Sequence, residues 1–153
     1  MGRTARDSAV EMTEIVLPED TNARGTIFGG RVLALVDKCA AVAALRHARG
    51  EVVTVSFDSV EFRHTVKVGN ILVLHGRLNA AFGSSMEIDV EVLAEDPATG
   101  VRTQTTRALV TMVALSPDGK PARVPPLLAL DDEDRRRAEE AGLRRARRLA
   151  ERP

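Results

Sequence analysis

The sequence predicts an α+β fold in which one long helix is wrapped by a curved antiparallel sheet of about five strands. A single long apolar helical pattern follows one strand-like segment, and four more strand-like segments with turn signals come after it. Consecutive strands joined by short turns pair in antiparallel fashion, and their apolar face needs the helix as a cover. With 153 residues, 44% of them apolar, the chain has the size and the core of one domain.

The helix is expected from about Gly29 to His47. The residues that fall together on one side, at roughly 100° per residue, are Val32, Val36, Cys39, Ala40 and Ala43. Apolar residues extend over more than half of the circumference, which is typical of a helix enclosed by other structure. Cys39 is therefore interpreted as a small core residue rather than a nucleophile, and His47 as a favourable partner for the helix dipole.

The strand-like segments are residues 11–17, 52–62, 71–78, 86–93 and 103–115. The clearest alternation lies in 86–93, where apolar and acidic residues take turns, so that the apolar ones face inward. The segment 52–62 is rich in β-branched residues. Simple alternation there places on one side Val53, Val55, Phe57 and Ser59.

Composition divides the chain into four parts. Residues 1–10 are expected to be an N-terminal tail, 11–116 the folded domain, 117–130 a linker, and 131–153 a charged helix or tail. The last part holds eight Arg and seven Asp or Glu, with acidic residues first and basic residues last. This order suits the dipole of a solvated helix.

Several classes of function are disfavoured by composition. Lys and Arg number 22 and Asp and Glu number 22, so the chain lacks the basic excess of a nucleic-acid-binding domain. The single cysteine and the three dispersed histidines argue against a disulfide and a metal site. Residues 1–10 have no signal-peptide pattern, and the apolar stretch 32–45 carries two charges, which argues against a membrane span. We expect a cytoplasmic protein without a metal or cofactor.

Asp37 is the residue that does not fit the helix pattern. It lies on neither the apolar face nor the basic face, and its neighbours along the helix surface include Ala34 and Ala41. A carboxylate among alanines leaves a shallow depression that a ligand or another chain can approach. The alternative is an aspartate near an exposed edge that pairs with Arg31 or Lys38.

The segment just before the helix is rich in glycine. Gly29 and Gly30 stand where the first N–H groups of a helix have no intrahelical partner. Such N–H groups, at the positive end of the helix dipole, can hold a carbonyl oxygen that becomes an oxyanion. The alternative interpretation is a glycine-rich helix entry that permits tight packing, and the pattern is not a phosphate-binding fingerprint.

These features occur together in an order that resembles a known family. Residues 18–30 read PxDxNxxGxIFGG, Asp37 follows within LALVDKCAAVAA, and VTV at 53–55, VG at 68–69 and GSS at 83–85 come later. Over about residues 11–116 the chain resembles the hotdog-fold acyl-CoA thioester hydrolases, and among them the cytosolic acyl-CoA hydrolases. The tail after residue 130 lies outside this resemblance.

The resemblance implies that two protomers pair their sheets edge to edge, with the active site between them, and that such dimers assemble into hexamers as trimers of dimers. Asp37 then corresponds to the catalytic carboxylate, which activates water or attacks the thioester carbonyl. Asn22 corresponds to the asparagine that orients the water or the thioester from across the interface. Gly29 or Gly30 would supply the N–H group that polarises the thioester oxygen.

The resemblance also implies contacts with the acyl-CoA substrate. Ser84 and Ser85 match a turn that lines the site in the opposing protomer. Arg63 and His64 follow a strand near where the CoA phosphates would lie, although a basic pair on the surface is the alternative. A carboxylate beside a glycine-rich helix start provides the base and the oxyanion donor that thioester hydrolysis needs without a metal.

Two other functions on the same fold stay open at this point. An acyl-thioester dehydratase needs a histidine that acts with a carboxylate at the helix, and residues 25–45 contain none. A non-catalytic module that binds acyl-CoA has no evident use for a carboxylate beside a thioester. The sequence therefore favours hydrolysis of acyl-CoA to a carboxylic acid and CoA.

Overall fold

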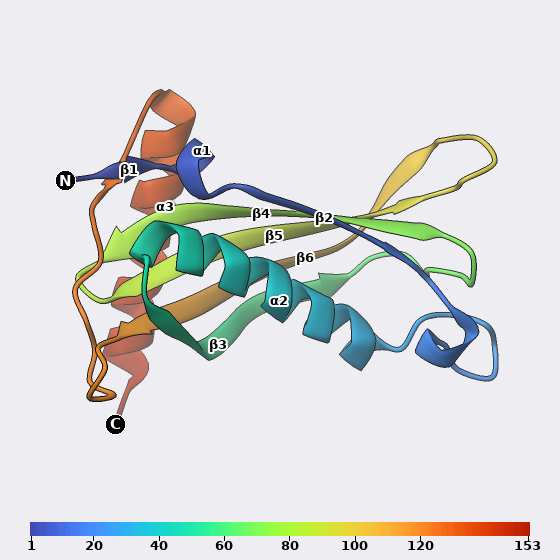
Figure 1. The fold of residues 1–153 in the computed structure, drawn as a ribbon, viewed down its shortest axis with the longest axis horizontal. Helices are drawn as coiled ribbons and strands as arrows, with labels where there is room; N and C mark the ends of the chain where they lie inside the picture. Colours follow the sequence, from blue (N-terminus) through green and yellow to red (C-terminus); the bar gives the residue numbers. More distant parts are fainter.

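The computed structural model, which describes residues 1–153, has one five-stranded antiparallel sheet that curves around a long helix (Figure 1). The strands of this sheet, in spatial order, are β2 (Val10–Ile15), β4 (Ile71–Phe82), β5 (Ser85–Glu95), β6 (Arg102–Leu115) and β3 (Glu51–Phe62). Helix α2 (Gly29–Ala48) lies against the inner face of the sheet. The predicted fold class is confirmed, and the strands β4, β5 and β6 are longer than the sequence pattern indicated.

Helix α2 and the inner face of the sheet form the core. All five residues of the predicted apolar side of the helix are buried. Gly76 of β4 permits the close approach of helix and sheet, because a Cβ atom there would lie 2.8 Å from the Cys39 sulfur. Burial raises the pKa of the Cys39 thiol to about 11, so the interpretation of Cys39 as a core residue is confirmed.

A bulge in β3 changes which side chains face the helix. The pairing of β3 with β6 shifts between Thr54 and Ser56, so that Thr54 lies opposite Met112, whereas Phe57 lies opposite Val110. Met112 and Val110 both point into the core. Thr54 and Phe57 therefore share the helix-facing side, and the prediction of one uninterrupted alternation from residue 53 to 59 is wrong, because a bulge inserts an extra residue.

The N-terminal residues differ from the expected tail. Residues Arg3–Thr4 form β1 and Ala5–Ser8 form a helical turn, α1. β1 pairs in parallel with β7 (Leu127–Leu128), which lies in the segment expected to be a linker. Between β2 and α2 the chain also forms one short 3-10 helix, η1 (Pro18–Asp20).

His47, in the last turn of α2, lies inside the protein. It is fully buried, and its Nε2 atom lies 2.7 Å from the Pro125 carbonyl oxygen. Burial lowers the pKa of the imidazole, which favours its neutral form, and the interpretation of His47 as a partner of the helix dipole stays a prediction. The Nδ1 atom of His47 is buried without a hydrogen-bond partner.

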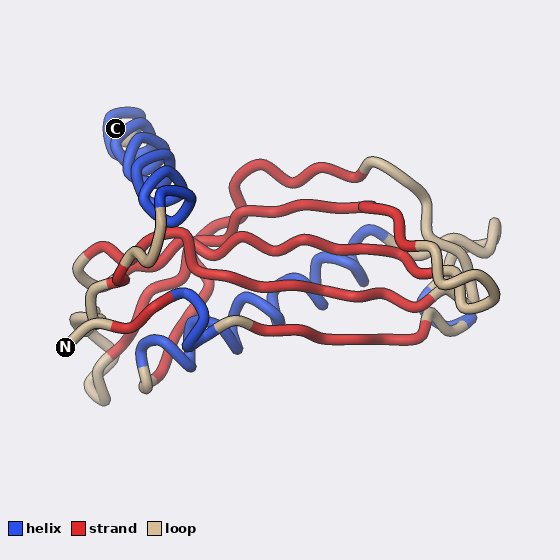
Figure 2. The backbone as a smooth tube through the Cα atoms, turned by 90° about the horizontal axis from the view of Figure 1, so that it is seen from above, coloured by secondary structure: helices blue, strands red, loops and turns tan.

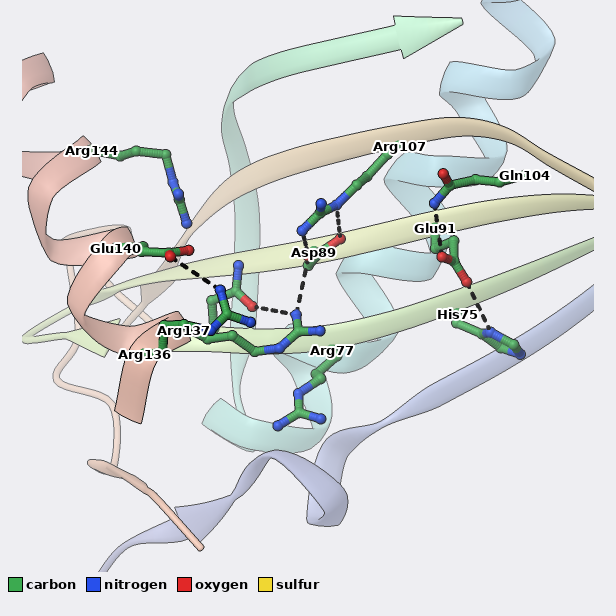
Figure 3. A pocket seen from close by; sticks show the side chains of 11 residues that line it. His75, Arg77, Asp89, Glu91, Gln104, Arg107, Arg136, Arg137, Glu140 and Arg144 are labelled. Carbon is green, nitrogen blue, oxygen red and sulfur yellow. Dashed lines mark hydrogen bonds and ion pairs between the residues drawn. The ribbon is translucent and has the colours of Figure 1, made fainter. Parts of the chain in front are cut away.

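Helix α3 (Asp132–Glu151) lies on the face of the sheet opposite to α2, near one end of the sheet (Figure 2). It contacts the sheet through charged pairs: Arg137 with Asp89, Arg144 with Glu87, and Arg148 with Asp58. Figure 3 shows several of these side chains around a polar hollow of about 360 Å³ that no apolar side chain lines. None of the helices is both long enough and apolar enough to cross a membrane.

Candidate active site

The side chain of Asp37 lies half-buried on α2, beside β3. The Thr54 hydroxyl donates a hydrogen bond of 2.5 Å to Oδ1 of Asp37. Asp37 forms no ion pair, since Arg31 instead pairs with Asp20 at 3.0 Å, and Lys38 is exposed. The alternative of an aspartate paired with Arg31 or Lys38 is therefore wrong, and the carboxylate is free to act on a ligand.

The start of α2 presents free amide groups. The N–H groups of Gly29 and Gly30 make no hydrogen bond, and no side chain caps the helix. A Cβ atom at Gly30 would meet nothing within 4 Å, and one at Gly29 would meet only the Phe62 ring. Both glycines are exposed. An anionic oxygen can therefore approach these N–H groups directly.

The loop that carries these glycines is fixed from two sides. The Phe28 N–H group donates a hydrogen bond of 3.0 Å to the Asp20 carbonyl oxygen. The carboxylate of Asp20 binds Arg31, which stands in the first turn of the helix. The helix start is therefore held in place before any ligand arrives, as an oxyanion site requires.

Asn22 organises its own loop and does not contact Asp37. Its Oδ1 atom accepts hydrogen bonds from the Arg24 N–H group at 2.9 Å and from the Thr26 N–H group at 3.3 Å. Its amide nitrogen donates to the Thr26 hydroxyl at 2.9 Å. The isolated chain thus does not bring Asn22 and Asp37 together.

The turn between β4 and β5, which holds Ser84 and leads into Ser85, lies at the other end of the molecule from the start of α2 (Figure 1). The Ser85 hydroxyl donates to the Phe82 carbonyl oxygen at 3.4 Å, and the Ser84 carbonyl oxygen accepts from the Ala114 N–H group. The two serines therefore do not meet Gly29 within one chain.

Arg63 and His64 differ in how freely they could meet a ligand. Arg63 is held by Glu61 at 2.7 Å and by Gln104 at 2.8 Å, which agrees with the alternative of a surface pair. His64 lines a pocket beside Gly29. Their assignment as CoA contacts stays a prediction.

Strand β3 forms a free edge of the sheet and carries exposed apolar side chains. Val53, Val55 and Phe57 expose 40%, 51% and 38% of their surface. An uncovered apolar edge is costly in water and available for pairing with another strand. Because Thr54 lies on the same strand, this edge adjoins the Asp37 carboxylate.

Comparison with known proteins places the chain in a family. The model of the thioesterase superfamily matches residues 24–101, the stretch that carries Gly29, Asp37 and Ser84. The chain belongs to the thioesterase superfamily. A protein of Bacillus subtilis, named as the uncharacterized acyl-CoA thioester hydrolase YkhA, is 36% identical to this thioesterase over 132 residues, which are 86% of this chain and 77% of that protein.

Solved structures extend the likeness to the whole thioesterase chain. An apo-hexameric acyl-CoA thioesterase is 42% identical, with a TM-score of 0.91, and the match covers 99% of both chains. An acyl-CoA hydrolase of Staphylococcus aureus, in complex with butyryl-CoA, CoA and CoA disulfide, is 35% identical, with a TM-score of 0.90 over 98% of this chain and 92% of that one. Structures of that protein's alanine variants at one aspartate, one asparagine and one threonine also match. The predicted family, a hotdog-fold acyl-CoA thioester hydrolase, is confirmed.

Sequence reasoning missed Thr54 as a residue of the site in this thioesterase. Its hydroxyl is the one group within the chain that hydrogen-bonds the Asp37 side chain. Thr54 belongs to the motif VTV, but simple alternation places its side chain on the side opposite to Val53, Val55 and Phe57. Only the strand register, with its bulge, turns Thr54 toward α2.

Proposed function

We propose that this thioesterase hydrolyses acyl-CoA to a carboxylic acid and CoA, with Asp37 as the catalytic carboxylate and Thr54 as the residue that positions it. The observation that carries the proposal is the half-buried Asp37 carboxylate, which no cation neutralises and which the Thr54 hydroxyl holds at 2.5 Å. The free N–H groups of Gly29 and Gly30 serve as the oxyanion donors.

The groups support two routes for the same reaction. In the first, Asp37 takes a proton from water, the hydroxide attacks the thioester carbon, and the N–H groups hold the resulting oxyanion. The tetrahedral intermediate collapses, the C–S bond breaks, and the CoA thiolate leaves and takes up a proton. In the second, Asp37 attacks the carbonyl directly and expels CoA, and water then hydrolyses the anhydride.

The length of α2 supports a site shared by two protomers. Gly29 and Asp37 are eight positions apart on one helix, which places their backbones about 12 Å apart at roughly 1.5 Å per residue. The carbon and oxygen of a thioester carbonyl are bonded neighbours. One thioester therefore cannot contact both the Gly29 N–H group and the Asp37 carboxylate of the same chain. We infer that the N–H groups and Asn22 of one protomer act with Asp37 and Thr54 of the other.

The exposed edge of β3 supports the same arrangement. Antiparallel pairing of two β3 strands about a two-fold axis would cover Val53 and Val55 and would bring the start of one α2 toward the Asp37 region of the other. It would also bring Ser84 and Ser85 of one protomer toward the helix start of the other. The hexameric neighbours support further assembly as a trimer of dimers.

Residue spacing in the Staphylococcus aureus protein supports the choice of residues. In its numbering, the altered asparagine precedes the altered aspartate by 15 positions, and the altered threonine follows it by 17. Asn22, Asp37 and Thr54 have the same spacings, since 37 − 22 = 15 and 54 − 37 = 17. Equal spacing supports a common set of three site residues in the two proteins.

Thiol release from acyl-CoA tests the proposal. The parent protein should liberate free CoA from short-chain acyl-CoA, and Thr54→Ala should lower kcat by roughly tenfold or more because Asp37 loses the group that positions it. Thr54→Ser, which keeps the hydroxyl, should recover most of the rate. A parent that releases no CoA, or equal rates for all three proteins, would refute the proposal.

A further inference from the structure

A small pocket lies beside the proposed oxyanion donors. It has a volume of about 230 Å³, and its walls include Ile27, Gly29, Val32, Phe62, Val66 and Thr106. These residues come from the loop before α2, the first turn of α2, the end of β3, the loop that follows β3, and β6. Thr26, His64 and Thr65 complete the lining, so four of the nine lining residues are apolar, whereas none lines the charged hollow beneath α3. The pocket therefore suits an apolar group better than that hollow does.

The walls of the pocket differ in how firmly they are held. Val32, Val66 and Thr106 are each only 2% exposed and are fixed by the core. Phe62 is 54% exposed, and its ring lies over Gly29, where a Cβ atom would meet it at 3.6 Å. Phe62 is therefore the wall that can be changed without disturbing the core.

The position of the pocket relates it to the thioester. Gly29 lines the pocket, and its N–H group is one of the two proposed oxyanion donors. A carbonyl oxygen held there leaves the acyl carbon beside the pocket, with the chain attached to that carbon. The pocket is thus continuous with the proposed site.

We propose that this pocket holds the acyl chain of the substrate and that Phe62 limits its length, so that this thioesterase acts on short- and medium-chain acyl-CoA. This inference rests on the proposed function. A cavity of about 150 Å³ holds a six-carbon ring, so a pocket of about 230 Å³ holds a chain of at most about eight or nine carbons.

The chain-length profile of kcat/KM tests the inference. For the parent, kcat/KM should rise by about fourfold per methylene from acetyl-CoA to about octanoyl-CoA. It should then level or fall toward palmitoyl-CoA, because further carbons find no apolar wall. Phe62→Ala should move this break to longer chains and raise the ratio of lauroyl-CoA to butyryl-CoA hydrolysis by at least tenfold. Phe62→Trp should move the break to shorter chains.

Two further measurements keep the result interpretable. The mass in solution of each variant shows whether Phe62, which ends the exposed strand β3, also affects assembly. Phe57→Ala removes the same ring from β3 at a position that does not line the pocket, and it should leave the chain-length break where the parent has it.

The outcomes separate this inference from the proposed function. A parent that hydrolyses acyl-CoA with no break, or with its best rate on palmitoyl-CoA, would overturn the inference and leave the proposed function intact. A Phe62→Ala variant that slows all chain lengths equally would also overturn it. A parent that hydrolyses no acyl-CoA would instead overturn the proposed function.

Discussion

The two faces of the sheet are covered in opposite ways. On the inner face, α2 packs apolar side chains against apolar strands, and Gly76 brings the backbones close. On the outer face, α3 places arginines against carboxylates, of which Glu87 is only 1% exposed. The inner helix also carries Asp37 and the free N–H groups. The comparison indicates that α2 both forms the core and carries the candidate catalytic groups, whereas α3 neutralises carboxylates that are buried on the sheet.

The largest effect is expected at Asp37, on the inner helix. Asp37→Asn should lower kcat by two or more powers of ten, because the amide can neither accept a proton from water nor attack the thioester. The melting temperature should stay close to that of the parent, since Asp37 forms no ion pair. A large loss of stability with a modest loss of rate would contradict the claim that Asp37 acts in catalysis and does not stabilise the fold.

The next effect is expected where α2 meets the sheet. Gly76→Ala should destabilise the fold by about 3 kcal/mol, because the new Cβ atom would lie 2.8 Å from the Cys39 sulfur. Adding Cys39→Ala should recover part of this loss, since it removes the sulfur and leaves the backbone contact. Denaturant unfolding of the three proteins checks this, and no recovery in the double variant would show that the close approach is not the cause.

A smaller loss is expected at α3. Arg144→Ala should cost about 2 kcal/mol, because the buried Glu87 carboxylate keeps only its hydrogen bond from Asn79. Arg136→Ala, which removes an exposed arginine from the same helix, should change stability by about 0.5 kcal/mol or less. Urea midpoints measured at low and high salt check both values. Equal losses for the two variants would argue against a special role of the buried pair.

The smallest effect is a pH dependence from His47. Burial lowers the pKa of His47 in the folded state, so the unfolded chain binds the proton more readily. The stability from this group is therefore present above the unfolded value, near 6.5, and is lost as the pH falls below it. His47→Gln should flatten this part of the curve of unfolding free energy against pH, and an unchanged slope would contradict the assignment.

The inner face could be predicted from the sequence and the outer face could not, for a physical reason. Apolar periodicity alone places Val36, Cys39 and Ala43 on the buried side of α2, and the structure confirms it. For α3, the same pattern of charged residues is compatible with a helix surrounded by solvent and with a helix that packs on carboxylates of the sheet. The partners Glu87 and Asp89 lie far away in the chain, and only the fold brings them beneath the arginines.

The candidate site was predicted in part. The family resemblance identified Asp37, Asn22 and the two glycines as site residues, but it did not identify Thr54. A bulge after Thr54 puts Thr54 and Phe57 on the same side of β3, whereas simple alternation puts them on opposite sides. A bulge depends on strand pairing, which residue patterns do not specify. In a site shared between protomers, the catalytic carboxylate and the oxyanion donors of one chain are too far apart to act on the same thioester. Neither the sequence nor a single subunit therefore shows the complete site.

The division of the site between two protomers is tested most directly by mixing two inactive variants. Asp37→Ala and Asn22→Ala proteins, each inactive alone, are unfolded together, refolded as a mixture, and assayed for thiol release. If Asn22 of one protomer acts with Asp37 of the other, half of the dimers are hybrids, and each hybrid has one intact site. The mixture should then regain about a quarter of the parent activity. If activity does not return although mixed dimers form, the two residues act within one chain or not at all, and the account of a shared site is wrong.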